Sequence, residues 1–394
     1  MKNVFTGTVR HIVFIALILL LLAPCSCRTE TESPGLPEEV LPDIRLLPKA
    51  AEPVTSGTES TIRINSSDAI PDFPQSITFV LEAESNYPLT DIRLLYTIPR
   101  ILRSSVTVTV QPEFEPDMNV SAEWTWDTRK STLPTGASVV YRWVVENSAQ
   151  QRIETEPVSM QFKDSRHDWE HLSNQNIDLY WYKGDDSFGR ELMEAGRQAL
   201  AKLAEDTDSE LTQQVQIYIY GSTEDLHQAL IYPDEWTGGM AFPEYGVIVI
   251  GVAPYNLEWG KRAVTHELSH MVVYQVTYSP LSNVPAWLDE GLAMYAEGDL
   301  LSNFSDNLKK AVSDDALYSI PSISGNFPAA TEEAELAYAQ SYSLVAFLIE
   351  QFGSAKMQQL LQAFSQGTRL DSALEEVYGF NSEQLETAWL DSVL

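Results

Sequence analysis

Residues 265–270 read Thr-His-Glu-Leu-Ser-His and contain the pattern His-Glu-x-x-His, formed by His266, Glu267 and His270. On an α-helix, residues four apart lie on one face, so both imidazoles can bind a single cation. Glu267 lies next to that face, where its carboxylate can reach a water at the metal without binding the metal itself. Neutral imidazole is a good zinc ligand, and zinc lowers the pKa of a bound water to about 7. The pattern therefore predicts a zinc site with a carboxylate beside it.

The pattern requires a helix, and its surroundings predict one. Residues 261–277 contain neither Gly nor Pro, and apolar residues recur through the segment at the spacing of a buried helix. The chain has six histidines in 394 residues, so a chance occurrence of the pattern is roughly a one-per-cent event. The alternative interpretation is a pair of histidines at a helix surface or hydrogen-bonded in the core.

A second segment supplies a third ligand. Residues 283–295 look like a helix opened by a proline, Pro285, in its first turn. Glu290 follows His270 by 20 positions. Catalytic zinc takes three protein ligands and keeps one open position, so a carboxylate from this helix would complete the set. Asp289 is an alternative on spacing, but its side chain would point about 100° away from that of Glu290. Glu290 is therefore the predicted ligand.

These residues resemble the gluzincin branch of zinc metallopeptidases, which carry His-Glu-x-x-His on one helix and a glutamate ligand on the next. The chain is most similar to the peptidase MA-like domains of bacterial exported proteins. The family pattern also fits the segment Trp-Leu-Asp-Glu-Gly-Leu-Ala at residues 287–293 and Tyr-Ala-Gln-Ser-Tyr-Ser at residues 338–343. The resemblance covers residues from about 169 to the end of the chain. It implies a thermolysin-like catalytic core, with His266, His270 and Glu290 as zinc ligands and Glu267 as the general base.

The chain departs from this family at one supporting position. Thermolysin-like enzymes have a carboxylate one turn after the glutamate ligand, where it orients a histidine ligand, but the corresponding residue here is Met294. Glu297 lies two turns after Glu290 on the same face. It is either an outer partner of the metal site or a solvated charge.

The transition state of peptide hydrolysis also needs a donor for the developing oxyanion. Gluzincins use a His or Tyr from the helical part, and no histidine follows His270 in this sequence. Tyr338 and Tyr342 are one helical turn apart and are the candidates, with Tyr338 as the first choice. The alternative is that both tyrosines only pack a helix that ends at Gly353.

Residues 236–242 contain two glycines and precede a predicted strand at 247–251. By analogy with the family, a strand here would form the edge of the cleft and pair with the backbone of a substrate. A glycine-containing turn is the alternative.

The expected function is that of a zinc-dependent peptidase acting on a peptide or protein substrate, with one Zn²⁺ per chain. Zinc would polarise the scissile carbonyl and its bound water, and Glu267 would move a proton from the water to the leaving amine. The competing hypothesis is a surface lipoprotein that uses the peptidase scaffold for binding without catalysis. The presence of Glu267 argues against it, because a structural zinc site has no use for a base beside the metal.

The preceding region, residues 61–163, has the period-two pattern of β-strands. Candidate strands lie at residues 77–81, 92–96, 106–110, 122–126, 138–145 and 158–162. Short strands at this spacing, separated by turn residues, predict an all-β sandwich of immunoglobulin or fibronectin type. No catalytic constellation occurs in it, so it serves as a spacer or as a binding domain, and the spacer role is ranked first.

From residue 164 the pattern changes to mixed α/β and then to helix. Strands are expected at 177–182, 214–220 and 247–251, and helices at 187–205 and 223–230, with helical periodicity from residue 259 onward. Trp259 and Trp287 are expected in the core. Expected helix breaks are at Pro280, Pro285, Gly298, Pro321, Pro328 and Gly353. The fold class is thus α+β: the N-terminal sandwich is followed by a peptidase MA-like domain at residues 164–394.

The first 60 residues predict export. A basic start at Lys2 and Arg10 precedes an apolar run at residues 12–23 that is too short to span a bilayer. Residues 22–27, Leu-Ala-Pro-Cys-Ser-Cys, resemble the lipobox of bacterial lipoproteins, in which a cysteine receives lipid after the signal is cut. Cys25 is preferred over Cys27, and a plain signal peptide is the alternative.

This reading predicts a signal peptide at residues 1–27 and a Pro- and Glu-rich tether at residues 28–60. It places the protein outside the cytoplasm, held to the cell membrane by a lipid anchor, or secreted if the cysteine is not lipidated.

Composition narrows the chemistry further. The chain has 25 Lys and Arg against 56 Asp and Glu, a formal net charge of −31, which disfavours nucleic acid as a partner. The two cysteines both lie in the first 27 residues, so the rest of the chain has no disulfide, cysteine nucleophile or cysteine metal ligand. Chemistry in the folded part must come from other side chains.

Overall fold

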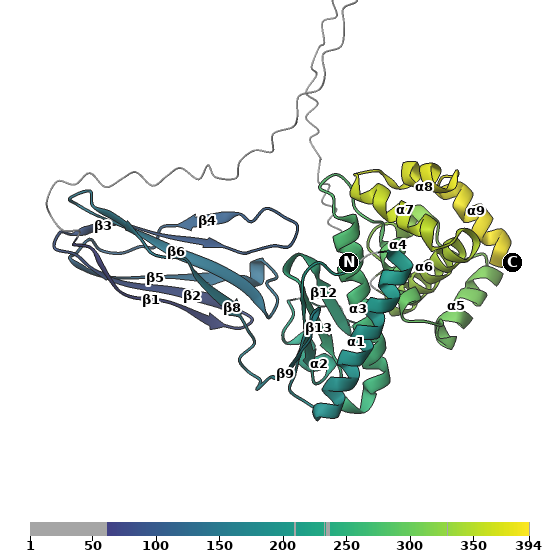
Figure 1. The fold of residues 1–394 in the computed structure, drawn as a ribbon, viewed down its shortest axis with the longest axis horizontal. Helices are drawn as coiled ribbons and strands as arrows, with labels where there is room; N and C mark the ends of the chain where they lie inside the picture. Colours follow the sequence, from purple (N-terminus) through teal and green to yellow (C-terminus); the bar gives the residue numbers. More distant parts are fainter. Residues whose placement is uncertain (1–60, 209, 232, 234–236, 329, 394) are drawn as a thin grey trace, which may run out of the picture. The chain divides into compact units, whose positions relative to one another are not determined.

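The computed structural model describes residues 61–394, except residues 209, 232, 234–236, 329 and 394. In this part of the chain, β-sheets come first and a helical region follows, so the predicted α+β class is confirmed (Figure 1). The predicted signal peptide, tether and cysteines Cys25 and Cys27 lie outside the described residues. No described helix is both long enough and apolar enough to cross a membrane.

Two antiparallel sheets form the N-terminal part of the described chain. The first sheet has the order β1-β2-β5 and the second has the order β4-β3-β6-β7, with β8 also paired to β6. Their strands are β1 (Arg63–Asp72), β2 (Ser76–Glu84), β3 (Leu89–Thr97), β4 (Thr107–Val110), β5 (Asn119–Asp127), β6 (Ala137–Asn147), β7 (Arg152–Glu154) and β8 (Val158–Phe162). Each of the six predicted strands overlaps one of these. Strands β1 and β7 escaped prediction because β1 is largely polar and β7 is three residues long.

The two sheets pack face to face around an aromatic core. Ile77, Phe79 and Leu81 of β2 alternate along the strand and are fully buried. The Phe79 ring lies 6.0 Å from the ring of Tyr96 on β3 and 5.2 Å from that of Tyr141 on β6, which joins the sheets. Burial of a large apolar side chain contributes about 1.5–3 kcal/mol, so this core stabilises the pair of sheets.

A third sheet follows, with the order β12-β13-β11-β10-β9. Strands β10, β11 and β13 are parallel, and β9 and β12 are antiparallel to their neighbours. The strands are β9 (Glu170–Ser173), β10 (Ile177–Trp181), β11 (Val215–Tyr220), β12 (Gly239–Phe242) and β13 (Val247–Gly251). For residues 236–242 the sequence allowed either a strand or a glycine-containing turn, and the structure has the edge strand β12 there.

The two faces of the third sheet have different partners. Along β11, Ile217 and Ile219 pack with the helices, whereas Tyr218 and Tyr220 pack in the core of the two N-terminal sheets. Because successive side chains of a strand point to opposite faces of the sheet, both faces of β11 lie in apolar surroundings. The Tyr220 hydroxyl donates a hydrogen bond to Oδ2 of the buried Asp164 at 3.1 Å. This bond joins the third sheet to the segment that follows β8.

Helices make up most of the remaining chain. They are α1 (Asp186–Thr207), α2 (Thr223–His227), α3 (Leu257–Thr277), α4 (Ala286–Ala296), α5 (Ser302–Ser313), α6 (Thr331–Phe352), α7 (Ser354–Ser365), α8 (Leu370–Tyr378) and α9 (Ser382–Val393). Helices α1 and α3 lie side by side along the third sheet, and α4 packs against both α3 and α6 (Figure 1). The predicted breaks separate these helices: α3 ends before Pro280, α4 follows Pro285, and α6 ends at Gly353.

The contact between α4 and α6 depends on Gly291. A Cβ atom at this position would lie 2.5 Å from the backbone oxygen of Ser341 and 2.6 Å from the side chain of Val345, both on α6. The absence of a side chain therefore allows the two helices to approach. Because Gly291 directly follows Glu290, the same contact fixes where the Glu290 side chain begins.

We predict that Gly291→Ala lowers the free energy of unfolding by about 1–3 kcal/mol, because it forces α4 and α6 apart. The better helix propensity of Ala returns only about 1 kcal/mol of this cost. Urea denaturation followed by circular dichroism measures the change. Gly325→Ala is the control, since a Cβ there meets no atom within 4 Å. An unchanged urea midpoint for Gly291→Ala would contradict the packing argument.

Candidate metal centre

Helix α3 presents the two histidines on one face. His266 and His270 are one turn apart, and their ring centroids are separated by 4.9 Å. The opposite face of α3 holds the helix in the core through Val264, Leu268 and Met271, which are essentially inaccessible to solvent. A buried apolar face with a polar face toward a second helix is the arrangement that the sequence predicted.

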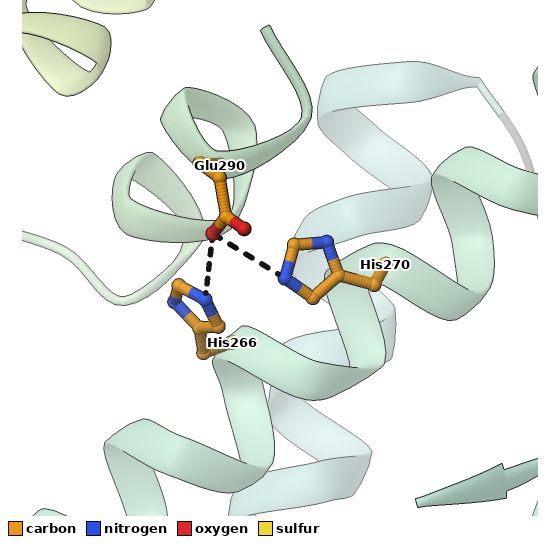
Figure 2. A group of neighbouring side chains, drawn as sticks. All are labelled: His266, His270 and Glu290. Carbon is orange, nitrogen blue, oxygen red and sulfur yellow. Dashed lines mark hydrogen bonds and ion pairs between the residues drawn. The ribbon is translucent and has the colours of Figure 1, made fainter. Parts of the chain in front are cut away.

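Glu290 reaches the two rings from α4. Its Oε2 lies 3.2 Å from Nε2 of His266 and 3.5 Å from Nε2 of His270, as Figure 2 shows. One donor atom from each of the three residues falls within 4.8 Å of the other two. A tetrahedral zinc with bonds of about 2.0–2.1 Å separates its ligand atoms by about 3.3 Å. The two nitrogen–oxygen distances are close to that value, so the three predicted ligands converge on a volume that suits one zinc ion.

The second nitrogen of each ring faces a carboxylate. Nδ1 of His266 lies 2.8 Å from Oε1 of Glu297, and Nδ1 of His270 lies 3.1 Å from Oδ1 of Asp289. The first contact is a hydrogen bond, whereas the second has the distance of an ion pair without hydrogen-bond geometry. Carboxylates in such positions orient ligating imidazoles and keep the other nitrogen available for a metal. Glu297 is therefore an outer partner of the site and not a solvated charge. Its other oxygen, Oε2, accepts a hydrogen bond from Nε of Arg262 at 3.0 Å.

Sequence reasoning missed the position of Asp289. It treated Asp289 only as a competing ligand, whereas the structure places its carboxylate against the far side of the His270 ring. The signal was present in the adjacent acidic pair Asp289 and Glu290, since neighbours on a helix point about 100° apart and can contact two sides of one group. Met294, at the position where the family has its carboxylate, contributes none.

The electrostatics of the cluster favour a cation. Burial alone would lower the pKa of both imidazoles, but the carboxylates outweigh it: Glu290 and Glu297 raise the pKa of His266, and Asp289 and Glu290 raise that of His270. Burial would raise the pKa of Glu290, yet His270 and His266 hold it below its ordinary value. The carboxylates that stabilise a protonated imidazole here would also stabilise a divalent metal ion. The donor set of two imidazoles and a carboxylate is consistent with zinc.

Glu267 lies beside this cluster, between α3 and the edge strand β12. The residue is 7% exposed, and burial raises the pKa of its carboxyl. The backbone N–H of Ala241 on β12 faces the carboxylate and partly offsets this effect of burial. A Cβ on Gly239 would lie 2.6 Å from Oε1, so the glycine leaves the space that the carboxylate occupies. Strand β12 thus holds Glu267 in position next to the three ligands.

The two tyrosine candidates, Tyr338 and Tyr342, lie at different cavities. Tyr338 lines the same cavity as His266, Glu267 and Glu290, and its ring centroid is 6.4 Å from that of His266. Tyr342 packs against Tyr295, 6.2 Å between centroids, and lines a different cavity. Of the two, Tyr338 is the one that the helix face of α6 brings to the centre.

Cavities open on both sides of the centre. An apolar cavity of about 230 Å³ is bordered by Trp259, Met294, Leu301, Phe304 and Tyr338. Trp259 is 38% exposed there, so the expectation that it lies in the core is wrong, while Trp287 is fully buried as expected. The Trp259 ring lies against Gly238, next to β12, and forms part of the cavity wall, which leaves it partly exposed. A second cavity, of about 170 Å³, lies next to His270 and Asp289 and is mostly polar.

Comparison with known proteins gives a family and distant structural similarities. Residues 195–394 match the Peptidase MA superfamily. No curated protein matches the sequence.

Two crystal structures illustrate the structural similarities. One is a mutant of the M1 zinc metallopeptidase from Deinococcus radiodurans, with 12% identity over 84% of this chain and 94% of that chain and a TM-score of 0.37. The other is catalytically inactive OgpA from Akkermansia muciniphila in complex with an O-glycopeptide substrate. It has 6% identity and a TM-score of 0.21 over 27% of this chain, and the alignment spans only 30% of the OgpA chain.

We predict that Glu290→Ala lowers zinc affinity by more than about 100-fold, whereas Glu297→Gln and Asp289→Asn lower it by about 10- to 100-fold. The first change removes a ligand, and the other two weaken the orientation of the rings. Competition with a chromophoric zinc chelator measures each affinity. Glu258→Gln, an exposed glutamate on α3, is the control. A larger loss for Asp289→Asn than for Glu290→Ala would mean that the ligand is misassigned.

Proposed function

The chain belongs to the Peptidase MA superfamily, and we propose that it hydrolyses peptide bonds with one zinc ion held by His266, His270 and Glu290. The observation that carries the proposal is the convergence of these three side chains with the buried carboxylate of Glu267 next to them. When bound, zinc supplies a Lewis acid that polarises the scissile carbonyl and lowers the pKa of a water to about 7. The substrate is a peptide or a protein.

Glu267 is the general base in this proposal. Its carboxylate accepts a proton from the attacking water and then donates it to the leaving amine, so that one residue serves both halves of the reaction. Burial raises the pKa of this carboxyl in the absence of zinc, and the charge of a bound zinc ion would lower it. The absence of a side chain at Gly239 leaves room for the carboxylate next to the three ligands.

Tyr338 is the proposed donor to the oxyanion that develops on the scissile carbonyl. Its support is its place in the cavity that also contains His266 and Glu267. A phenol hydroxyl in a partly buried site is a strong donor because little water competes with it.

Strand β12 is the proposed binding edge for the substrate backbone. It pairs with β13 on one side and with no other described strand, and it borders the central cavity through Gly239, Met240 and Ala241. An extended peptide can add to such an edge by backbone hydrogen bonds. This addition would carry the scissile bond past Glu267.

The location of the enzyme is a further part of the proposal. The basic start, short apolar run and Cys25 support export and lipid anchoring at the cell membrane, with residues 28–60 as the tether. We also propose that residues 61–163 form a sandwich of immunoglobulin or fibronectin type and that residues 164–394 form a thermolysin-like catalytic domain. The alternative function, a binding scaffold without catalysis, is an outcome of the first test below.

We predict that Glu267→Gln retains zinc at the wild-type stoichiometry but cleaves peptides about 10²- to 10⁴-fold more slowly, because the amide cannot accept the proton. Metal analysis and cleavage of a casein or peptide-library substrate are measured on the same preparations, with Glu258→Gln as the control. Equal zinc content without cleavage by the wild type would favour the binding scaffold.

We predict that Tyr338→Phe lowers kcat by about 10²- to 10³-fold with unchanged zinc content, because it removes a hydrogen bond made in the transition state. Tyr342→Phe, one turn away on α6, is the matched control and should retain wild-type kinetics. Steady-state kinetics on a cleaved peptide distinguish the two. Equal rates for both variants would remove Tyr338 from the mechanism.

A further inference from the structure

A loop of the N-terminal sheets reaches the edge of the metal centre. Residues 98–106 connect β3 to β4, and the backbone N–H of Ile101 donates to the backbone oxygen of Glu244 at 2.7 Å. Glu244 lies in the short 3₁₀ turn Pro243–Tyr245 that directly follows β12. The Tyr274 hydroxyl on α3 donates to the backbone oxygen of Ile101 at 3.5 Å. The loop is therefore hydrogen-bonded both to the turn after β12 and to α3, the helix that carries the histidines.

Two arginines of this loop share one carboxylate but have different surroundings. Arg100 and Arg103 lie 3.3 Å and 3.6 Å from Oε2 of Glu244. The Arg100 guanidinium is 5.8 Å from the centroid of the Tyr245 ring, and that of Arg103 is 5.5 Å from the centroid of Tyr278. Of the two, Arg103 alone borders the polar cavity next to His270 and Asp289.

The polar cavity has the chemistry of a binding site for a charged group. Besides Arg103, its border includes the hydroxyl-bearing residues Tyr274, Tyr278 and Ser282 and the amide of Asn283. Arg103 is the one guanidinium or ammonium group among the described residues that line it. Its side chain is 45% exposed, its Nη1 lies 3.6 Å from Oε2 of Glu244, and Tyr274 and Tyr278 are its other neighbours. The planar group has five N–H donors, more than the Glu244 contact uses.

Among the charged residues that border the cavity, Arg103 is the one that can bind an anionic group. Asp289 is the one carboxylate among the described residues that border this cavity, and its Oδ1 lies 3.1 Å from Nδ1 of His270. The chain as a whole has a net charge of −31, so an acidic substrate is repelled unless a local cation receives it. A guanidinium matches a carboxylate geometrically because it can donate two parallel hydrogen bonds.

We propose that Arg103 binds a carboxylate of the substrate, so that the loop from the N-terminal sheets forms a specificity subsite of the peptidase. The proposal rests on the proposed function at the metal centre and deepens it by naming an acidic peptide as the preferred substrate. The carboxylate is either a side chain of Asp or Glu or the free C-terminus of the peptide. The apolar cavity on the other side of His266 also has a guanidinium at its border, that of Arg262, but this group is already paired with the Glu297 carboxylate and with the backbone oxygen of Asp299.

The test uses a synthetic peptide library with free or amidated C-termini. The peptides are captured by the immobilised, zinc-loaded full chain carrying Glu267→Gln. The same capture is repeated with Arg103→Gln or Arg100→Gln added to that background. We expect carboxylate-bearing peptides to be enriched roughly fivefold to tenfold over their amide counterparts, and Arg103→Gln to abolish the enrichment. Arg100→Gln, which loosens the same contact to Glu244, should retain it.

The pattern of enrichment distinguishes the two sources of the carboxylate. Enrichment at one internal position indicates an acidic side chain, and enrichment restricted to free C-termini indicates the terminal carboxylate. No enrichment, or equal enrichment with and without Arg103, would overturn the proposal. So would equal losses for both arginine variants, because that result assigns Arg103 a structural role only.

Cleavage of the same library by the protein with Glu267 intact separates this proposal from the proposed function. Capture that depends on Arg103 without any cleavage supports the subsite and refutes the peptidase activity. Cleavage with no acidic preference on either side of the scissile bond supports the activity and refutes the subsite. Thermal unfolding of each variant, monitored by circular dichroism, verifies that the compared proteins are folded.

Discussion

The contact of the Glu290 carboxylate with two imidazoles of α3 is the interaction on which the centre depends. A single oxygen of Glu290 lies within 3.5 Å of a nitrogen of both His266 and His270. Two helices must cross at close range for this to occur, and α4 is positioned in turn by its approach to α6 at Gly291. The geometry of the ligands is thus set by helix packing at the residue next to Glu290, in a core rigid enough to hold it.

The same cluster contains several carboxylates, and neutral imidazoles would leave their negative charge uncompensated. Asp289, Glu290 and Glu297 contact the imidazoles, and Glu267 lies beside them. The pKa of both imidazoles is raised accordingly, against the effect of burial. Two imidazole protons and one divalent cation bring the same charge, so a zinc ion can replace the protons without upsetting the electrostatic balance of the buried site. This balance explains why outer carboxylates are tolerated in an interior where an unpaired charge is costly.

Sequence reasoning located the ligands because their geometry is local. The spacing of His266 and His270 follows from one helical turn, and Glu290 follows from the need for a third ligand on the next helix. The contacts of Glu297 and Asp289 depend on how α3 and α4 cross, and no periodicity in one segment reports that crossing. The choice of Tyr338 over Tyr342 needs the rotation of α6 about its axis. Strand β1 is recognisable only by its pairing with β2, from Arg63↔Glu84 to Asp72↔Ser76, because its own residues lack an apolar alternation.

The packing of the N-terminal sheets against the third sheet was not predictable, since it depends on contacts between residues far apart in the sequence. Tyr218 and Tyr220 of the third sheet are part of the apolar core of the N-terminal sheets. At Gly136, before β6, a Cβ would lie 2.6 Å from the Tyr218 ring, so the two surfaces are fitted closely. A loop carried by a domain packed in this way has a defined position relative to α3. Its backbone bond from Ile101 to Glu244 holds the loop at the cleft, so the substrate binding proposed for Arg103 would order a side chain but not the loop backbone.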